Sequence, residues 1–396
     1  MSATTAERIR TYRGPAVLGL GFRPFFLAAG LWSALAMLLW ILLLTGGIDL
    51  PIALAPVDWH VHSLLYGFVP ATVTGFLLTA VPNWTGRLPL QGRPLIALLL
   101  AWFAGRIAVA ASAWLGWAAT MALDCAYLLI LAAVVGREIV TGKNWRNLKV
   151  LAILSLMLLC NVAFHLEAHL TGVASYAQRG AIAATLLLVI LIGGRVTPSF
   201  TRNWLVRENP GPLPTAGGRL DNFFVTSAAL AAAAWVAFPQ GGWTGALLAV
   251  AGCAQVVRLS RWLGWRARRD VLVLVLHVFY AFIPVGYFLA ALAAWRPDLV
   301  ASSAGVHAWT VGAVGGMILA VMTRASLGHT GRALRASPAT IGIYIALGVA
   351  AAARIVAALS PAWSLPLLHL AAGAWIIAFA GFAIVYGPLL ARPRSP

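Results

Sequence analysis

The chain has 396 residues, of which 61% are hydrophobic and 10% charged, with a mean hydropathy of +0.89. Soluble domains carry about a quarter charged residues and build single cores only up to roughly 250–300 residues, so this composition excludes an ordinary soluble protein and indicates an all-α polytopic membrane protein. The net charge of +18 does not indicate a nucleic-acid partner, because the basic residues lie in short loops between apolar stretches, the positive-inside pattern of membrane proteins.

About twelve apolar stretches are long enough to cross a bilayer, which needs about 20 residues for each helix. We predict spans at 22–44, 59–81, 93–115, 116–140, 147–170, 177–200, 221–239, 243–262, 270–294, 301–324, 337–359 and 364–390. Lys and Arg are concentrated at the two termini and in the connections that follow even-numbered spans. The pattern predicts a multi-pass protein of the bacterial inner membrane with both termini in the cytoplasm. We expect the whole chain, 1–396, to form a single transmembrane domain in lipid.

Histidines gather near the predicted outer face. Six of the eight fall there: His60, His62, His165, His169, His307 and His369. Neutral imidazole is the commonest metal ligand, and ionisable side chains within spans are rare, so this gathering predicts a bound metal or haem. A lone membrane histidine more often hydrogen-bonds to a neighbouring helix, and that alternative stays open for each of them.

Helical spacing groups these histidines further. His165 and His169 are four residues apart on one predicted helix, so they share a face and can hold one ion together. His60 and His62 are two residues apart, about 200° around a regular helix, so only one of them can face a shared site. The other is then expected to form a hydrogen bond at the interface.

Two carboxylates fall within or at the end of predicted spans on the outer side, Asp124 in the fourth and Glu167 in the fifth. One interpretation is a proton relay from the outer face, since embedded ionisable groups are a functional hypothesis by default. The other is a structural carboxylate paired with an arginine of a neighbouring helix, such as Arg106 or Arg354.

A second polar layer lies at the predicted inner face. Arg195 and Arg324 lie closest to the membrane there. They either anchor helices at the interface or form a site for an anion or a haem propionate. His277 lies in the inner half of the ninth span, and His329 lies in the cytoplasmic connection after the tenth.

Spans two and ten look alike. In each, a histidine is followed five residues later by glycine and twenty-five residues later by the arginine of a Thr-Gly-Arg sequence. The two sets are His62, Gly67 and Arg87, and His307, Gly312 and Arg332. Span six ends in a looser version, Thr201 to Trp204, whose Asn-Trp pair matches Asn83-Trp84 after span two. Similar helices at spans two, six and ten recur every four spans and predict three pseudo-repeated four-helix units, 15–141, 142–262 and 263–396.

That arrangement resembles the catalytic subunit of haem-copper oxidases, which has twelve spans in three four-helix arcs and takes its haem histidines from the second and tenth. By this analogy His62 and His307 both ligate haem, although likeness of architecture alone is a weak argument for chemistry. Spans six and seven, which carry the copper histidines of that superfamily, contain no histidine here. Copper would need other ligands, such as His165 and His169.

Several longer motifs resemble the NnrS family over nearly the whole chain. They are Gly21 to Phe26, Trp59 to His62, Gly75 to Gly86, Gly193 to Arg195, Met322 to Arg324 and Gly328 to Arg332. One departure is Ser63, where the family commonly has an acidic residue after the second histidine. The resemblance implies a haem- and copper-containing membrane protein of denitrification and nitric oxide stress, with nitric oxide as ligand or substrate.

The resemblance and the residues together predict nitric oxide reduction or detoxification at a haem b, with copper or another second metal nearby. His62 and His307 are the predicted haem ligands, His165 and His169 ligate the second metal or haem, and His60 is a partner to either. Arg195 and Arg324 are candidates for haem propionates, and His277 with His329 for an inner haem. The chain has no CxxCH and no blue-copper pattern, so electrons are expected from a quinol or a separate redox protein.

Two alternatives come from other classes of protein. One is a nitric oxide or haem sensor or storage protein that binds the gas without turnover. The other is a twelve-helix transporter, which would have Gly- or Pro-broken helices around a mid-membrane site, as Pro70, Pro198 and Pro284 allow.

Overall fold

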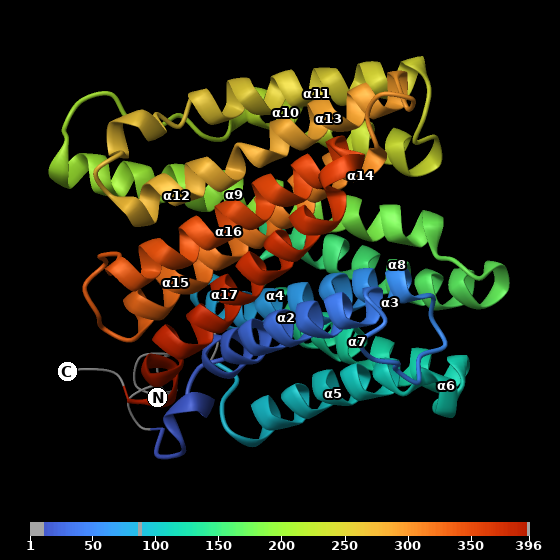
Figure 1. Cartoon of the computed structure of the whole chain (residues 1–396). Helices are drawn as coiled ribbons and strands as arrows, with labels where there is room; N and C mark the ends of the chain where they lie inside the picture. The colour runs from blue at the N-terminus through green and yellow to red at the C-terminus, as the bar shows by residue number, and fades with distance from the viewer. Residues whose placement is uncertain (1–11, 86–88, 394–396) are drawn as a thin grey trace. The chain divides into compact units, whose positions relative to one another are not determined.

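The structure, a computed structural model, describes residues 12–85 and 89–393, without the side chains of 82–85. The described residues form no β-strand, and twelve of their helices are long and apolar enough to cross a membrane (Figure 1). The prediction of an all-α polytopic membrane protein is therefore confirmed. Arg87, the end of the first copy of the repeat pattern, lies outside the described residues.

The chain divides into two compact units. Unit 1 comprises residues 1–181, 325–332 and 382–396, and unit 2 comprises residues 182–324 and 333–381. The expectations of a single transmembrane domain and of three four-helix repeats stay predictions.

Unit 1 holds the first five spans. They are α2 (Phe22–Leu44), the second span built from α3 (Pro56–His62), η2 (Ser63–Phe68) and α4 (Val69–Thr85), then α5 (Arg93–Ala110), α7 (Trp117–Thr141) and α8 (Leu148–Thr171). A four-residue helix, α6 (Ser112–Leu115), lies between α5 and α7. Helix α4 packs against α2 and α7, and α7 packs against α5 and α8.

The two ends of the described chain meet in unit 1. The buried guanidinium of Arg23, at the start of α2, donates hydrogen bonds to the backbone oxygens of Leu390 and Arg392. These residues lie at the end of α17 (Ser364–Ala391). The start of the first span and the end of the last span therefore lie together in unit 1. A chain with an even number of spans, here twelve among the described residues, begins and ends on the same side of a membrane.

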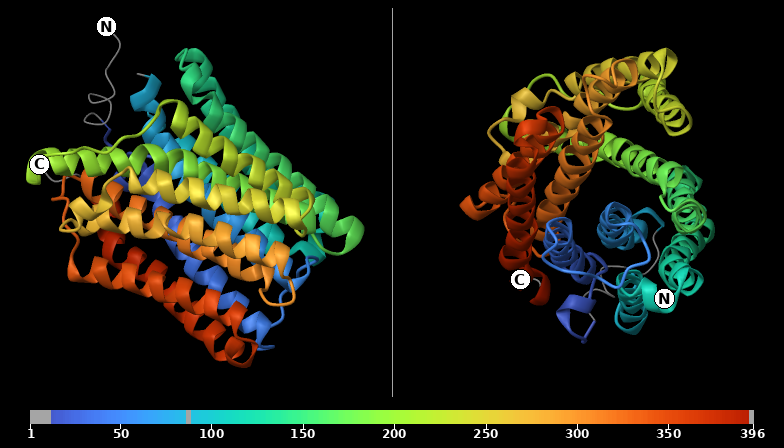
Figure 2. Two further views of the ribbon diagram at one scale, coloured as in Figure 1. Left: turned by 90° about the horizontal axis from the view of Figure 1, so that it is seen from above. Right: turned by 45° about the vertical axis from the view of Figure 1, so that its right-hand side comes forward.

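Unit 2 begins within α9 (Ser175–Glu208). The following helices are α10 (Gly218–Ala237), α11 (Gly242–Ser260), α12 (Val271–Tyr280), α13 (Phe282–Trp295), α14 (Ser302–His307), η5 (Ala308–Gly315), α15 (Gly316–His329), α16 (Pro338–Leu359) and α17. The last part of α15, from residue 325, and the last part of α17, from residue 382, belong to unit 1. Helix α11 packs between α10 and α13, as Figure 2 shows, and α16 packs against α14 and η5.

Local sequence explains where several helices begin. Proline occupies the first turn of α3, α5 and α16, where its missing N–H would have no helical partner. The carboxylate of Asp270 accepts from the backbone N–H of Leu272 at 2.9 Å and so caps α12. The hydroxyl of Ser337 caps α16 in the same way, at 3.2 Å from the N–H of Thr340.

One helix is longer than its predicted span. The sequence predicts the sixth span at 177–200, but α9 passes through Pro198 and ends at Glu208. A proline inside a helix removes one backbone hydrogen bond, and neighbouring hydroxyl groups can take up the freed carbonyls. Pro198 leaves the carbonyl of Gly194 without its usual helical donor, yet the helix continues beyond the proline, where the Thr201 hydroxyl donates to the Thr197 carbonyl at 2.8 Å. The polar end of α9 therefore projects beyond the apolar stretch as helix.

Spans two and ten share a backbone irregularity that their sequences did not predict. A π-helical segment follows directly after His62 (η2) and after His307 (η5). Such wide turns are uncommon and often mark functional sites. At the glycine of each pattern an aromatic side chain comes close: a Cβ at Gly67 would lie 2.3 Å from the indole nitrogen of Trp32, and one at Gly312 would lie 2.4 Å from the ring of Phe282.

Candidate metal centre in unit 1

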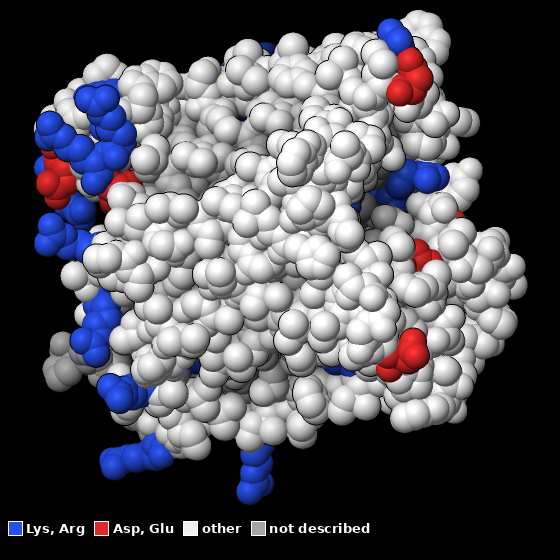
Figure 3. All heavy atoms as spheres, in the orientation of Figure 1, with Lys and Arg blue, Asp and Glu red and all other residues white. Residues whose placement is uncertain are grey.

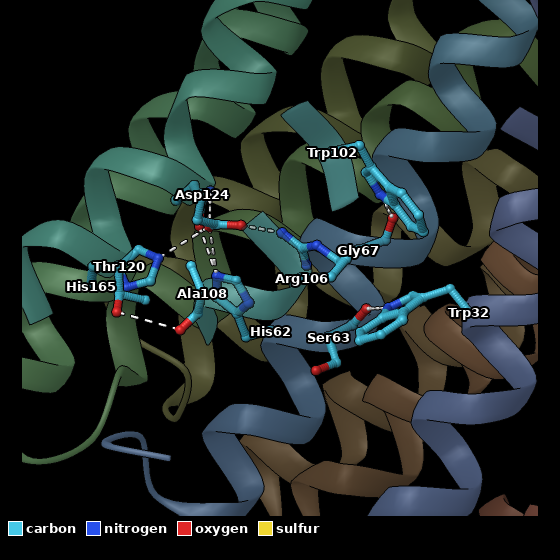
Figure 4. A network of polar contacts seen from close by, with 11 residues as sticks. Trp32, His62, Ser63, Gly67, Trp102, Arg106, Ala108, Thr120, Asp124 and His165 are labelled. Carbon is cyan, nitrogen blue, oxygen red and sulfur yellow. Dashed lines mark hydrogen bonds and ion pairs between the residues drawn. The ribbon is translucent and has the colours of Figure 1, made fainter. Parts of the chain in front are cut away.

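Three spans of unit 1 bring two imidazoles and one carboxylate together. His62 ends α3, Asp124 lies within α7 and His165 lies near the end of α8. The Nε2 atom of each histidine lies 3.1 Å from Oδ2 of Asp124. All three side chains are buried, and one ligand atom from each lies within 4.8 Å of the other two. Figure 4 shows both imidazoles and the carboxylate converging.

The carboxylate of Asp124 is fixed by further donors. Nη2 of Arg106, on α5, donates to Oδ1 of Asp124, and the side-chain amide of Asn161 donates to Oδ2 at 2.7 Å. The amide oxygen of Asn161 also lies 3.0 Å from Nε2 of His62. Arg106 supplies the positive charge that a buried carboxylate needs, and Asn161 links the carboxylate to an imidazole.

The π-helical segment η2 is fixed by two indoles. The Trp32 indole donates to the Ser63 carbonyl at 2.8 Å, and the Trp102 indole donates to the Gly67 carbonyl at 2.9 Å, as Figure 4 also shows. These bonds fix the backbone of the π-helical segment directly after His62. They therefore help to orient the His62 side chain at the end of α3.

Several buried polar atoms around this cluster have no hydrogen-bond partner in the part of the chain that the structure describes. They are Nδ1 of His62, Oγ of Ser63, the hydroxyl of Tyr66, and Nε and Nη1 of Arg106. The Tyr66 ring lies 4.9 Å from the His62 ring, so these atoms belong to one neighbourhood. Leaving a buried polar group unpaired costs about 1–3 kcal/mol, and such groups call for an explanation such as an ion or a ligand.

The donor set fits a transition-metal ion. Two imidazole nitrogens and one carboxylate oxygen form a ligand set used by non-haem iron, and imidazole also suits copper and zinc. Each Nε2 now faces the carboxylate, so a bound ion would take the place of the Nε2 protons and hold all three side chains through the atoms that already converge. Arg106 and Asn161 would be the outer partners that orient the carboxylate.

The other histidines of the predicted outer layer lie in other surroundings. The His60 ring stacks on Trp40 with centroids 4.5 Å apart, and the exposed His169 ring stacks on Trp117 at 4.3 Å. The structure therefore pairs His165 with His62 and Asp124 rather than with His169.

Two outer-layer histidines bond to their own helices. Nδ1 of His307 lies 2.6 Å from the Ser303 carbonyl oxygen, and Nδ1 of His369 lies 2.9 Å from that of Leu365. Nδ1 then donates to the carbonyl, which fixes the tautomer with Nε2 as the lone-pair nitrogen.

Glu167, the second carboxylate of the predicted relay, caps a helix. Its two oxygens accept from the backbone N–H groups of Tyr176 and Ala177 at 2.9 and 2.8 Å, in the first turn of α9. This is a structural role, in which a carboxylate satisfies orphan donors at a helix N-terminus. For Asp124 the structure shows the pairing with Arg106 that the sequence offered as the alternative to a relay.

The inner-face candidates lie in separate surroundings. Nε2 of the buried His277 lies 2.8 Å from the Thr201 hydroxyl, whereas the exposed His329 packs its ring 5.4 Å from that of Phe22. The guanidinium of Arg324 lies 4.2 Å from the Phe200 ring centroid, and its buried Nη1 has no hydrogen-bond partner among the described residues. Arg195 is half-buried.

Unit 2 contains a second Arg–Asp pair, in which the arginine is buried and the aspartate is partly exposed. Arg258 of α11 donates to both carboxylate oxygens of Asp221 at 2.8 and 3.1 Å. Its Nη1 donates to the Ile190 carbonyl at 3.0 Å and to the Tyr280 hydroxyl at 2.9 Å. A Cβ at Gly194 would lie 2.0 Å from Nη2 of Arg258, so this glycine of α9 makes room for the guanidinium.

The sequence left part of the centre unidentified. Asn161 precedes His165 by four residues, so it lies on the same helical face, and that spacing could have pointed to it. Ser63 and Tyr66 gave no such signal, because their surroundings depend on the π-helical turn and on helices distant in sequence.

Comparison with known proteins identifies a family. The family model described as NnrS protein matches residues 16–394, nearly the whole chain. Neither the curated proteins nor the solved structures include a match to this chain.

Proposed function

The chain belongs to the NnrS family, which makes it a nitric-oxide-related membrane protein, and from that premise we propose that it reduces nitric oxide at a metal centre held by His62, Asp124 and His165. The overall reaction combines two molecules of nitric oxide with two electrons and two protons, giving nitrous oxide and water. The atoms and charges balance without any further reactant.

One observation carries this proposal: three converging ligand atoms are surrounded by buried polar atoms that lack partners. A purely structural ion pair would be expected to satisfy its donors, since most buried polar groups in proteins are hydrogen-bonded. Here Nδ1 of His62, the Tyr66 hydroxyl and two nitrogens of Arg106 are unpaired among the described residues. A bound ion with a small diatomic ligand would give such donors something to contact.

A metal ion bound in this site would supply Lewis-acid polarisation and a template for the two gas molecules. His62 and His165 would hold it through Nε2, and Asp124 would add a carboxylate oxygen. Arg106 and Asn161 keep that carboxylate in place. The Tyr66 hydroxyl, whose ring lies 4.9 Å from that of His62, is positioned to donate a hydrogen bond or a proton near the centre.

We assign haem b, the cofactor expected in this family, to His307. The Nδ1–H···O=C bond of His307 to Ser303 is the kind of hydrogen bond that orients a metal-ligating histidine, which would hold the iron through Nε2. His307 is also followed directly by a π-helical segment, as His62 is. The second metal, copper or iron, is then held by His62, Asp124 and His165. His60 and His169 are ligands of neither the haem nor the second metal.

In this proposal the electrons come from a quinol in the inner membrane or from a separate redox protein. The sequence contains no CxxCH haem attachment and no blue-copper pattern.

The test uses the full chain purified in detergent. Metal and haem contents are measured first, then absorption spectra of the oxidised and dithionite-reduced protein with and without nitric oxide, and finally nitrous oxide by gas chromatography with a reduced quinol as donor. We expect bound metal, a spectral shift on adding the gas, and nitrous oxide. Asp124→Asn should lose metal and turnover, whereas His169→Ala should keep both.

Two outcomes contradict the proposal. Tight gas binding without nitrous oxide in the presence of a working donor indicates a sensor or storage protein. Folded protein that takes up neither metal nor haem when both are supplied indicates a transporter.

A further inference from the structure

A basic hollow in unit 2 lies apart from the proposed metal centre. It has a volume of about 970 Å³ and lies among the end of α9, the segment from η4 (Gly264–Ala267) to the start of α12, and residues 334–336 before α16. Figure 3 shows Lys and Arg gathered at the end of unit 2 where α12 begins. The residues that define it here are Trp204, Arg207, Trp265, Arg268, Arg269 and Arg335.

Not all charges of the hollow are available to a ligand. Arg266 is occupied, because its guanidinium donates to backbone carbonyl oxygens of residues 209, 210 and 212. Arg207 pairs with the neighbouring Glu208 at 3.4 Å. The other carboxylate, Asp270, accepts from the first turn of α12. Both acidic residues of the lining are therefore already engaged by groups of the chain.

Three arginines of the hollow keep an uncompensated charge. Arg268, Arg269 and Arg335 are exposed, and over residues 12–85 and 89–393 no hydrogen bond or ion pair engages their side chains. Like charges held together raise the local potential and attract an anion. A guanidinium group can donate two parallel hydrogen bonds to two oxygens of one phosphate, so a phosphate is the anion that matches these arginines best.

The position of the hollow at the ends of spans corresponds to the depth expected for lipid headgroups. Helix α9 ends at Glu208, α12 begins at Val271 and α16 begins at Pro338, so its walls are the ends of three spans. Trp204 and Trp265 are among its lining residues, and Trp265 is 60% exposed. Tryptophan is typical of the membrane–water interface, where headgroup phosphates lie.

We propose that this hollow binds the phosphate headgroup of an anionic phospholipid, with Arg268, Arg269 and Arg335 as its ligands. Basic pockets between transmembrane helices on the cytoplasmic side are a known means of binding such headgroups. The basic loops place this end of unit 2 on the cytoplasmic side by the positive-inside rule. A hollow of this size exceeds a bare phosphate and can enclose a phosphate with its glycerol.

The experiment compares two charge-matched triple variants of the full chain. R268Q/R269Q/R335Q removes three charges from the hollow, and K143Q/R146Q/K149Q removes three exposed charges from unit 1. Each delipidated protein is titrated with phosphatidylglycerol or phosphatidylcholine in mixed micelles, and bound lipid is counted by native mass spectrometry while the thermal midpoint is recorded. A parallel titration uses inorganic pyrophosphate.

We expect the wild type and the unit 1 variant to retain phosphatidylglycerol over phosphatidylcholine and to gain thermal stability with it. The hollow variant should bind phosphatidylglycerol at least 10-fold more weakly and gain no stability, with an unchanged midpoint in phosphatidylcholine. Equal phosphatidylglycerol binding by the two variants would overturn the proposal. So would pyrophosphate that displaces the lipid at comparable concentration, since the ligand would then be a soluble phosphate compound.

If the hollow variant does not fold, the single substitution R335Q decides between the outcomes. Arg335 lies on the segment before α16, away from the α12 cap, and its loss should weaken phosphatidylglycerol binding about 3-fold or more. Unchanged binding by R335Q would count against the proposal.

Discussion

Each unit of this protein buries an arginine against an aspartate, but the surroundings of the two pairs differ. In unit 2 every guanidinium nitrogen of Arg258 has a partner, in Asp221, Tyr280 or the Ile190 carbonyl. In unit 1 the Arg106–Asp124 pair leaves Nε and Nη1 of Arg106 unpaired among the described residues. Two imidazoles also approach Asp124, whereas no histidine is among the groups that bond to Asp221 in the described part of the chain.

The contrast separates a structural ion pair from a candidate binding site. A fully satisfied buried ion pair fixes the helices that carry it, because its charges have been compensated within the protein. An ion pair that has unpaired donors and two imidazoles beside it can instead form hydrogen bonds and coordinate bonds to a bound group. The comparison predicts that unit 2 variants lose stability alone, whereas unit 1 variants lose bound metal as well.

The largest effect is expected from Asp124→Ala. This change leaves the buried Arg106 without its counter-charge, and breaking a buried pair in this way costs about 3–5 kcal/mol. It also removes one ligand and the anchor of both imidazoles. Unfolding in detergent and metal analysis of the purified protein measure the two losses. A stable, metal-loaded variant would show that Asp124 is not at the centre.

Arg258→Met sharpens the comparison from the other side. The loss of stability should be smaller, about 2–3 kcal/mol, because Asp221 is 17% exposed and can be hydrated when its partner is gone. Metal content, measured on the same preparation, should equal that of the wild type. Loss of metal from a folded Arg258→Met protein would contradict the division of roles between the two units.

His165→Ala and His169→Ala form a matched pair on one helix. His165 contacts Asp124, whereas His169 stacks on Trp117, so only the first should weaken metal binding. Loss of a metal ligand should lower the metal affinity by more than the roughly 10–100-fold that loss of an outer partner costs. Competition with a chelator gives both affinities. Equal effects of the two substitutions would favour the pairing of His165 with His169 that helical spacing predicts.

Asn161→Leu tests the outer partner of the centre. The leucine keeps the volume but removes the hydrogen bonds to Asp124 and His62. Metal affinity should fall about 10–100-fold while the ligand count stays the same. An affinity within 2-fold of the wild type, by the same chelator competition, would mean that Arg106 alone orients the carboxylate.

Tyr66→Phe should have the smallest effect on stability, about 1 kcal/mol or less in either direction, because the hydroxyl has no hydrogen-bond partner among the described residues. Metal content should not change. The rate of nitrous oxide formation should fall if the hydroxyl serves the reaction near His62. An unchanged rate would remove Tyr66 from the proposed mechanism.

The sequence predicted the fold well where a signal was local. The first span, 22–44, coincides with α2, and the remaining spans overlap observed helices, because length and hydropathy define a membrane helix without help from its neighbours. Helix α9 differs most at its end, since it continues to Glu208, eight residues beyond the predicted span of 177–200, through a polar stretch that hydropathy does not assign to the membrane.

The site was predicted only in part. His62, His165 and Asp124 were each singled out by type and depth, and Arg106 was one of two suggested partners of Asp124. Their convergence could not be predicted, because it depends on which helices pack together and on the π-helical turn after His62. Spacing along one helix instead favoured His169, which is in phase with His165 but faces Trp117.

The most direct test of the central claim counts the imidazole ligands of the bound metal. X-ray absorption at the metal edge, on metal-loaded wild type, His165→Ala and His169→Ala proteins, gives the number of nitrogen and oxygen ligands at about 2.0–2.2 Å and the imidazole share of the scattering. The account predicts two imidazoles in the wild type and in His169→Ala, and one imidazole or no bound metal in His165→Ala. Two imidazoles retained in His165→Ala would contradict it and place the metal elsewhere in the protein.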